Sequence, residues 1–215
     1  NPFGIGADFV VLSLSKYYSA AQCIGGAILY NNKFNNNDSK NYFVTREINN
    51  INWWLKYVGS HVSPYNCKLI LDNFDTIEER LVFAYKNVNR SIQYIRQNFV
   101  GLFTKINYLY DSTHHSHNLV LKYFNSSIGP SVFTIVVPIN MKKAKNVCKS
   151  LTKLCIVTSY GHNYTSLDPY FKKYEDNQHV LFRINVGYGQ EFEANDEISV
   201  RDCLDDLFDN IRKFI

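Results

Sequence analysis

The sequence predicts an α/β chain in two parts, a strand-and-helix segment at residues 1–75 and then a connecting helix with an α+β part at residues 76–215. Three observations support this prediction. The β-branched, apolar run at residues 8–14 is typical of a strand buried on both faces, as in a parallel sheet covered by helices. A long helical pattern follows at residues 75–97. The residues after it alternate between strands and helices, which fits a small open-faced sandwich.

The first part contains one more strand and one helix. Residues 25–30, "GGAILY", have the composition of a second short strand, and residues 31–41 are polar and rich in asparagine, as in a surface loop. Apolar residues then recur at helical spacing, which predicts an amphipathic helix at residues 42–58. Gly59 and Pro64 are expected to end this helix.

The connecting helix carries a start signal. Asp75 is placed to cap its first turn, and Glu78 lies three positions further on, where the partner of a capping box is found. We therefore expect the helix to begin directly after Asp75. Helices of the length predicted at residues 75–97 often connect two lobes.

The second part is expected to hold strands and helices in alternation. The predicted elements are a strand near residues 105–109, a polar loop at 111–118, a short helix near 118–125, a strand at 131–139, a helix at 141–151, a strand at 154–159, a strand at 179–188 and a closing helix at 199–215.

Composition restricts the class of protein. Hydrophobic residues make up 46% of the sequence, yet no apolar stretch is long enough to span a bilayer, so we expect a soluble, cytoplasmic protein without a membrane partner. The net charge of +4 is spread among both signs, so no nucleic-acid partner is expected. The first residue is asparagine and a strand follows almost at once, so we expect this chain to be the later part of a longer one.

Cysteine and histidine give little support to a metal site. The five cysteines are widely separated and form no CxxC pair, which favours reduced intracellular thiols. His114, His115 and His117 lie one to three positions apart in a polar loop, where side chains rarely converge on one ion. We therefore expect no metal.

Lys16 follows the first apolar run. A lysine that loses hydration becomes less protonated, as a Schiff-base nucleophile requires. The alternative is that Lys16 lies at the exposed end of the strand with its ammonium group in water. Ser13 and Ser15 place two hydroxyl groups beside the cation, where a phosphate can be held.

Arg183 lies in a predicted strand with apolar residues on either side. A guanidinium group there needs an anion, and its fork of N–H groups matches a carboxylate. The sequence leaves two interpretations open. Arg183 either binds the carboxylate of a substrate or forms a structural pair with an Asp or Glu of the chain.

Four segments of the chain follow a known pattern in order. They are "GADFVVLSLSKYYSAAQCIGG" at residues 6–26, "SPYNCKLILDNFDTIEERL" at 63–81 with Thr76 and Arg80, "TSYGHNYTSLDPY" at 158–170 and "LFRINVGYGQE" at 181–191. Together they resemble the Cys/Met metabolism family of trans-sulfuration enzymes, which depend on pyridoxal 5′-phosphate (PLP). The third segment is most similar to the fungal branch of the cystathionine γ-synthases, and Asn185 replaces a usual serine in the fourth.

The resemblance implies the aspartate-aminotransferase-like fold, fold type I. Residues 1–75 would be the end of the large PLP-binding domain with its mostly parallel sheet, and residues 76–215 the connecting helix and the small α+β domain. Lys16 would bind the cofactor aldehyde as a Schiff base, and Ser13 and Ser15 its phosphate. Arg183 would bind the α-carboxylate of the substrate, with Ser159 in support.

The resemblance also implies a function. It is that of a cystathionine γ-synthase, which makes cystathionine from an O-acylhomoserine and cysteine, in a homotetramer built as a dimer of dimers. A β-lyase or γ-lyase of the same family and a catalytically silent paralogue that serves as a binding module remain alternatives. In the family, an earlier half supplies further cofactor contacts, so we expect residues 1–215 alone to be inactive.

Overall fold

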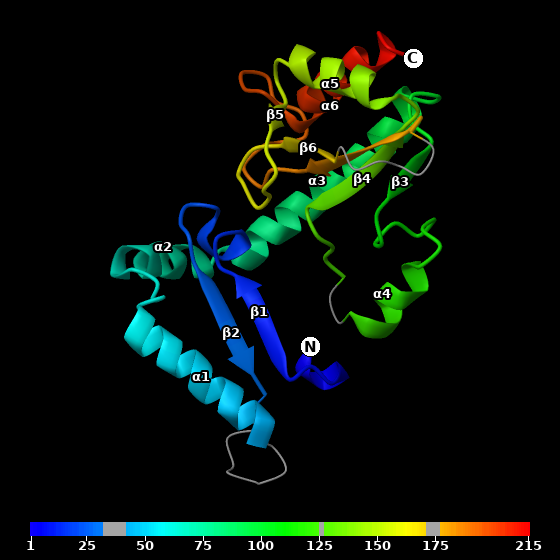
Figure 1. Ribbon diagram of the computed structural model, residues 1–215. Helices are drawn as coiled ribbons and strands as arrows, with labels where there is room; N and C mark the ends of the chain where they lie inside the picture. Colours follow the sequence, from blue (N-terminus) through cyan, green and yellow to red (C-terminus); the bar gives the residue numbers. More distant parts are fainter. Residues whose placement is uncertain (32–41, 125–126, 171–176) are drawn as a thin grey trace. The chain divides into compact units, whose positions relative to one another are not determined.

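The computed structural model describes residues 1–31, 42–124, 127–170 and 177–215 (Figure 1). The chain divides into two compact units, Asn1–Asp75 and Thr76–Ile215. From residue 32 onward, the polar loop expected at residues 31–41 lies outside the described residues, as does Asn125 at the end of a predicted helix. No helix among the described residues is both long enough and apolar enough to cross a membrane.

The first unit opens with a short 3-10 turn, η1 (Phe3–Ile5), and a pair of strands, β1 (Phe9–Ser13) and β2 (Gly26–Tyr30). The two strands pair antiparallel, with Phe9 opposite Tyr30 and Ser13 opposite Gly26. The expected burial of both faces of the first strand is wrong for the described residues, because Val11 is 76% exposed. An apolar run predicts a strand, but it does not say what covers that strand.

Two α-helices follow the strand pair in the described residues of the first unit. α1 (Tyr42–Val58) has the predicted bounds, and the chain leaves it at Gly59. α2 (Pro64–Phe74) was not predicted, because Pro64 was interpreted only as a helix breaker. Proline is well tolerated in the first turn of a helix, where its missing N–H is not needed. Ser63 caps this turn by accepting a hydrogen bond from the backbone N–H of Asn66 at 3.2 Å.

The long helix of the second unit, α3 (Ile77–Asn98), begins later than predicted. Asp75 ends α2, and Thr76 precedes α3 without a capping bond from its side chain. The prediction that Asp75 caps the long helix is therefore wrong. Glu78 and Glu79 lie in the first turn, where a negative charge is favourable beside the helix dipole.

A five-stranded sheet forms the centre of the second unit. Its strands are β3 (Lys105–Asn107), β4 (Val132–Val137), β5 (Cys155–Ile156), β6 (Ser166–Tyr170) and β7 (Val180–Asn185), in the order β3-β4-β7-β6-β5. Among the described strands of this sheet, β5 and β6 pair parallel and the other neighbours pair antiparallel. β6 was not predicted, since Pro169 and Asp168 are uncommon in strands.

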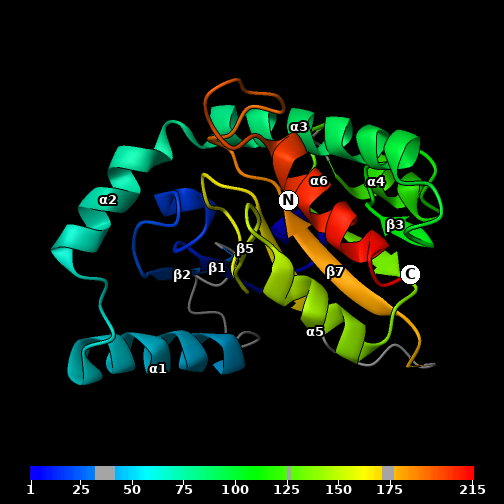
Figure 2. The same cartoon turned by 90° about the horizontal axis from the view of Figure 1, so that it is seen from above.

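One face of this sheet carries the core. Alternate residues of the central strands, such as Phe182 and Ile184 of β7 and Phe133 of β4, are buried in a single apolar cluster with residues of α3, α5 (Met141–Ser150) and α6 (Val200–Arg212). These three helices cover the face (Figure 2). α4 (His117–Tyr123) follows β3. The predicted α+β arrangement of this part is thus present.

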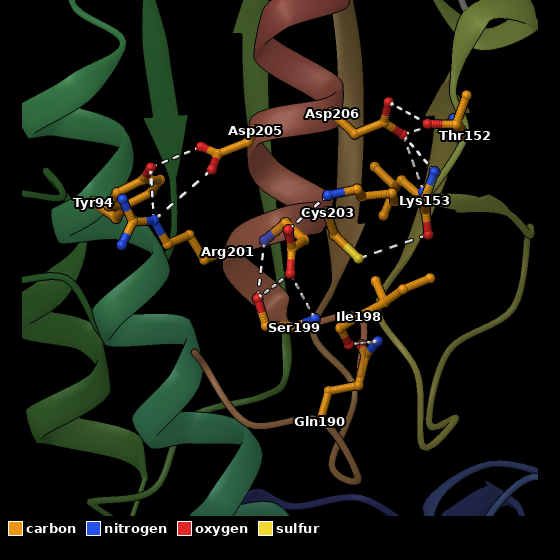
Figure 3. A network of polar contacts seen from close by, with 12 residues as sticks. Tyr94, Thr152, Lys153, Gln190, Ile198, Ser199, Arg201, Cys203, Asp205 and Asp206 are labelled. Atoms are coloured by element: carbon orange, nitrogen blue, oxygen red, sulfur yellow. Dashed lines mark hydrogen bonds and ion pairs between the residues drawn. The ribbon is translucent and has the colours of Figure 1, made fainter. Parts of the chain in front are cut away.

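Polar contacts fix α6 in place (Figure 3). Asp206 accepts hydrogen bonds from the backbone N–H groups of Thr152, Lys153 and Leu154 at 2.8, 2.8 and 3.2 Å. Burial alone would raise the pKa of Asp206, but these backbone bonds outweigh burial and lower it. On the other side of the helix, the Tyr94 hydroxyl donates to Asp205 at 2.7 Å and so connects α6 to α3.

The cysteines are all free thiols. Cys203 of α6 is fully buried, and burial raises the pKa of its thiol to about 12. Burial likewise raises the pKa of Cys148 to about 11. Both thiols therefore stay protonated near neutral pH and serve as packing groups.

Candidate functional site

The turn that carries Lys16 begins where β1 ends, and Ser15 attaches it to the start of β2. The Ser15 hydroxyl donates to the Gly25 carbonyl oxygen at 3.1 Å and accepts from the Gly25 backbone N–H at 2.8 Å. The Leu14 N–H also donates to the Gly25 carbonyl, at 3.0 Å. Lys16 follows directly and is half-buried. Its main chain is therefore held from the first residue of the turn onward.

The far side of the turn, through η2 (Tyr17–Ser19), is equally fixed. The Ala21 N–H donates to the Lys16 carbonyl at 2.9 Å, and the Ser19 N–H donates to the Leu14 carbonyl at 3.1 Å. Ala20 and Ala21 have φ angles of 55° and 59°, a left-handed conformation that residues with a Cβ rarely adopt. A strained conformation of this kind persists only where the surrounding structure imposes it.

The hydroxyl groups around Lys16 differ in what they can offer a phosphate. Ser13 is exposed at the end of β1, whereas the proton of Ser15 is already bound to Gly25. Ser19 is fully buried, and its Oγ has no hydrogen-bond partner within the described part of the chain. Sequence reasoning missed Ser19, and its only signal was a small polar residue three positions after Lys16.

Arg183 lies on the sheet face opposite the core. The strand register aligns Asn107 of β3, Thr134 of β4, Arg183 of β7 and Asp168 of β6 across four neighbouring strands. Residues directly opposite one another on antiparallel strands project from the same face. The sheet therefore has a polar row on this face, with a cation and a carboxylate side by side.

The contacts of Arg183 are specific. Its Nη2 lies 2.6 Å from Asp168 Oδ2 and donates to the Thr158 carbonyl oxygen at 2.5 Å. The guanidinium group also lies 5.7 Å from the centre of the Tyr160 ring. The described residues thus contain an internal anion for Arg183, which is one of the two interpretations that the sequence left open. Sequence reasoning did not identify Asp168.

Asn185, one of the residues that depart from the family pattern, connects the segment around Ser159 to β7. Asn185 Oδ1 accepts from the Ser131 hydroxyl at 2.9 Å and from the Gly161 N–H at 3.5 Å, while its amide donates to Ser166 at 3.4 Å. Ser159 itself is half-buried. Asn185 therefore holds the chain beside Arg183 in one arrangement.

Glycine and arginine residues of the other motifs have structural roles. A Cβ on Gly187 would lie 2.5 Å from the Tyr164 carbonyl carbon, so only glycine allows these two segments to approach. Arg80 Nε donates to the Thr76 hydroxyl at 3.2 Å, and the guanidinium group lies 5.0 Å from the centre of the Tyr188 ring. Burial lowers the pKa of Arg80 and raises that of Tyr188.

The loop histidines lie close together. The His114 and His115 rings stack at 4.4 Å, and His117 Nδ1 lies 2.9 Å from the Leu109 carbonyl oxygen. Among the described residues, no three or more His, Cys, Asp or Glu side chains are arranged so that they could hold a metal ion.

The predicted site residues are divided between the two units. Ser13, Ser15 and Lys16 belong to the first unit, and Ser159 and Arg183 belong to the second.

Comparison with protein families decides the relationship. Residues 1–177 match the family of Cys/Met metabolism PLP-dependent enzymes. The chain belongs to this family. The family predicted from the sequence is therefore confirmed, and PLP, the predicted cofactor, is the cofactor of this family. Comparison with curated proteins finds no match.

Three solved structures of similar fold come from bacteria. A Campylobacter jejuni protein assigned as an O-acetylhomoserine (thiol)-lyase, which holds N′-pyridoxyl-lysine-5′-monophosphate, superposes with a TM-score of 0.76 at 21% identity over 98% of this chain and 53% of its own. Cystathionine γ-synthase of Xanthomonas oryzae pv. oryzae, in complex with cystathionine, gives 0.71 at 18% identity over 99% and 51%. MetB of Corynebacterium glutamicum gives 0.72 at 17% over 99% and 51%.

These likenesses establish the fold. The predicted PLP-dependent fold type I is confirmed, since the neighbours are family members and the match includes nearly the whole of this chain. The chain spans about half the length of the solved structures it matches.

Proposed function

We propose that this chain forms the C-terminal half of a PLP-dependent enzyme of sulfur amino acid metabolism, in which Lys16 binds the cofactor covalently. The observation that supports this most directly is the family match over residues 1–177, which includes Lys16 in a turn fixed at both ends by backbone hydrogen bonds. A turn fixed in this way keeps the main chain of Lys16 in one place, which limits the region that its amine can reach.

The residues around Lys16 suit a phosphate-bearing aldehyde. Lys16 supplies the amine and Ser13 an exposed hydroxyl. Ser15 contributes a donor only by exchanging its bond to the Gly25 carbonyl for one to the phosphate. Ser19 adds a buried hydroxyl whose oxygen has no partner in the described residues, which is costly unless a polar group meets it.

Each residue then has a distinct task in the reaction. PLP, when bound, would withdraw electrons from the α-carbon of an amino acid and so make its C–H bond acidic. The amine of Lys16 would hold the cofactor and would accept the α proton as a general base. Arg183 binds the substrate carboxylate and so orients the α-carbon, with Ser159 in support.

The reaction that we propose is γ-replacement, in which cysteine sulfur displaces the acyloxy group of an O-acylhomoserine and gives cystathionine. The Xanthomonas neighbour, a cystathionine γ-synthase in complex with cystathionine, supports this choice. A β-lyase or γ-lyase would use the same residues. We further propose a cytoplasmic homotetramer, a dimer of dimers, as is usual in the family.

A second candidate is a silent paralogue that serves as a binding module. The Arg183–Asp168 ion pair favours it, because a guanidinium group already bound to a carboxylate is less available to a substrate. In that case Lys16 would be an ordinary half-buried lysine.

The two candidates are separated by Lys16→Ala in the complete natural polypeptide. We expect this variant to lose the visible absorption of bound cofactor and its turnover with O-acylhomoserine and cysteine, while its circular dichroism stays unchanged. Lys68→Ala is the matched control, because Lys68 lies in α2 of the same unit, is exposed and forms an ion pair with Asp72. Normal cofactor absorption in Lys16→Ala would refute the enzyme proposal.

A further inference from the structure

We propose that Asp168 is a specificity-determining residue of this site, because its carboxylate occupies Arg183 and competes with the carboxylate of the substrate. The proposal rests on the proposed function in one respect only, the role of Arg183 as a carboxylate-binding group. Asp168 is the directly opposed cross-strand neighbour of Arg183, so the sheet itself holds the two charges together.

The atoms of the guanidinium group make the competition direct. A guanidinium group has two edges that offer parallel N–H groups to a carboxylate, and Nη2 belongs to both of them. Asp168 Oδ2 lies 2.6 Å from Nη2 in an ion pair, and the same nitrogen donates a hydrogen bond to the Thr158 carbonyl oxygen at 2.5 Å. Both oxygens therefore lie against the nitrogen that a bidentate carboxylate would use at either edge. Such a carboxylate can bind only after one of these two oxygens moves.

The negative charge of Asp168 further opposes the binding of a substrate carboxylate. The side chains of Asp168 and Arg183 are only 11% and 22% exposed, so water screens them weakly. Thr134 and Asn107, which continue the row across the sheet, are neutral and hydrogen-bond each other at 3.1 Å. A substrate carboxylate that approaches Arg183 thus meets the negative charge of Asp168 at close range. Like charges at such a distance weaken binding strongly.

Removal of this charge should therefore tighten carboxylate binding. Asp168→Asn keeps the shape of the side chain and loses its negative charge. If Asp168 instead served to hold Arg183 in position for the substrate, the same change would weaken binding. The direction of the effect separates the two roles.

The test measures carboxylate binding at Arg183 without cofactor chemistry. Propionate is a suitable probe, because it has a carboxylate but no amine that could react with an aldehyde. Phenylglyoxal modifies arginine, and mass spectrometry of the peptide that contains Arg183 gives the modification rate in the complete natural polypeptide. Protection by increasing propionate concentrations then gives an apparent dissociation constant.

We expect this dissociation constant to be lower in Asp168→Asn than in the unmodified protein by about tenfold or more. In steady-state assays the KM for the amino acid substrate should fall with it, with little change in kcat. Asp209→Asn is the matched control, since it removes one negative charge from an exposed position of α6, where Asp209 pairs with Arg212. It should keep the unmodified protein's dissociation constant. If Asp168→Asn does not fold, Asp168→Ser gives the same comparison.

An equal or higher dissociation constant in the Asp168 variant would overturn the proposal. Absence of protection in every variant would also overturn it, since Arg183 would then bind no carboxylate. Cofactor absorption of the same samples distinguishes this failure from failure of the proposed function. A protein that holds cofactor but shows no propionate protection refutes only the role of Arg183 and Asp168.

Discussion

Asp202 shows at the residue scale how local charge stabilises the second unit. Its carboxylate accepts a hydrogen bond from Lys153 Nζ at 2.6 Å and one from the Ser199 backbone N–H at 3.1 Å, in a capping box at the start of α6. The bond from Lys153, followed by those from Ser199, lowers the pKa of Asp202 from 3.8 to about 2. The ionised form is therefore the one that stabilises the fold.

The sign of the pH dependence follows from this shift. A carboxyl group whose pKa is lower in the folded than in the unfolded state stabilises the fold at every pH above its unfolded-state pKa. This stabilisation is lost as the pH falls through the folded-state pKa. We expect Asp202→Asn to lower the melting temperature by about 2–4 °C at pH 7, as for a lost helix cap. The difference should shrink between pH 4 and about 2.

Thermal unfolding followed by circular dichroism across this pH range measures the effect. Asp209→Asn, a change to an exposed carboxylate of the same helix, is the control and should have a smaller effect. If the difference in melting temperature between Asp202→Asn and the unmodified protein stayed constant from pH 7 to pH 2, ionised Asp202 would not be the stabilising group.

Functional residues could be predicted where their neighbours in the sequence make a charged side chain unexpected. Arg183 among apolar residues indicated a need for an anion, and the end of an apolar run singled out Lys16. Asp168 was not predictable, because the strand that carries it was missed and the pairing depends on the register of β6 against β7. Ser19 was missed because its burial is a property of the folded turn.

The β1–β2 pair shows at the element scale what is unusual about the first unit. A two-stranded ribbon is marginally stable in water by itself, and apolar side chains such as Val11 and Ile28 remain 76% and 47% exposed here. A groove of about 830 Å³ lies between this ribbon and α1 and is lined largely by apolar side chains. We infer that further protein covers these surfaces in the complete natural polypeptide.

This inference predicts the effect of a charge on β1. Val11→Asp in the complete natural polypeptide should lower the free energy of unfolding by roughly 3 kcal/mol or more, because an unpaired carboxylate would be buried. Denaturant titration measures it. Val100→Asp is the matched control, since Val100 is 78% exposed in the second unit and should tolerate the change. Equal effects of the two substitutions would mean that the surface around Val11 is free.

Elements were predictable where the periodicity of the sequence decides them, as for α1 and the strands with strong apolar alternation. α2 was missed because Pro64 has two meanings, and only the helix that follows distinguishes a first-turn proline from a breaker. The burial of β1 was mispredicted because an apolar sequence reflects what surrounds a strand in the complete fold. In the described residues, β1 pairs with one neighbouring strand, β2.

At the scale of the whole molecule, the residues that we propose for cofactor and for substrate binding belong to different units. Lys16 belongs to the unit Asn1–Asp75 and Arg183 to the unit Thr76–Ile215, and the chain spans about half the length of the solved structures that share its fold. We infer that contacts to the cofactor ring and phosphate come in part from outside residues 1–215. The family and fold were predictable from four motifs in order, because these motifs extend over both units.

The central claim is that the amine of Lys16 binds the cofactor aldehyde. Borohydride reduction in the presence of PLP, followed by peptide mapping, tests it most directly. In the complete natural polypeptide, the pyridoxyl label is predicted on the peptide that contains Lys16, while residues 1–215 alone should take up little label. A label on another lysine of the complete polypeptide, or on none, would contradict the account.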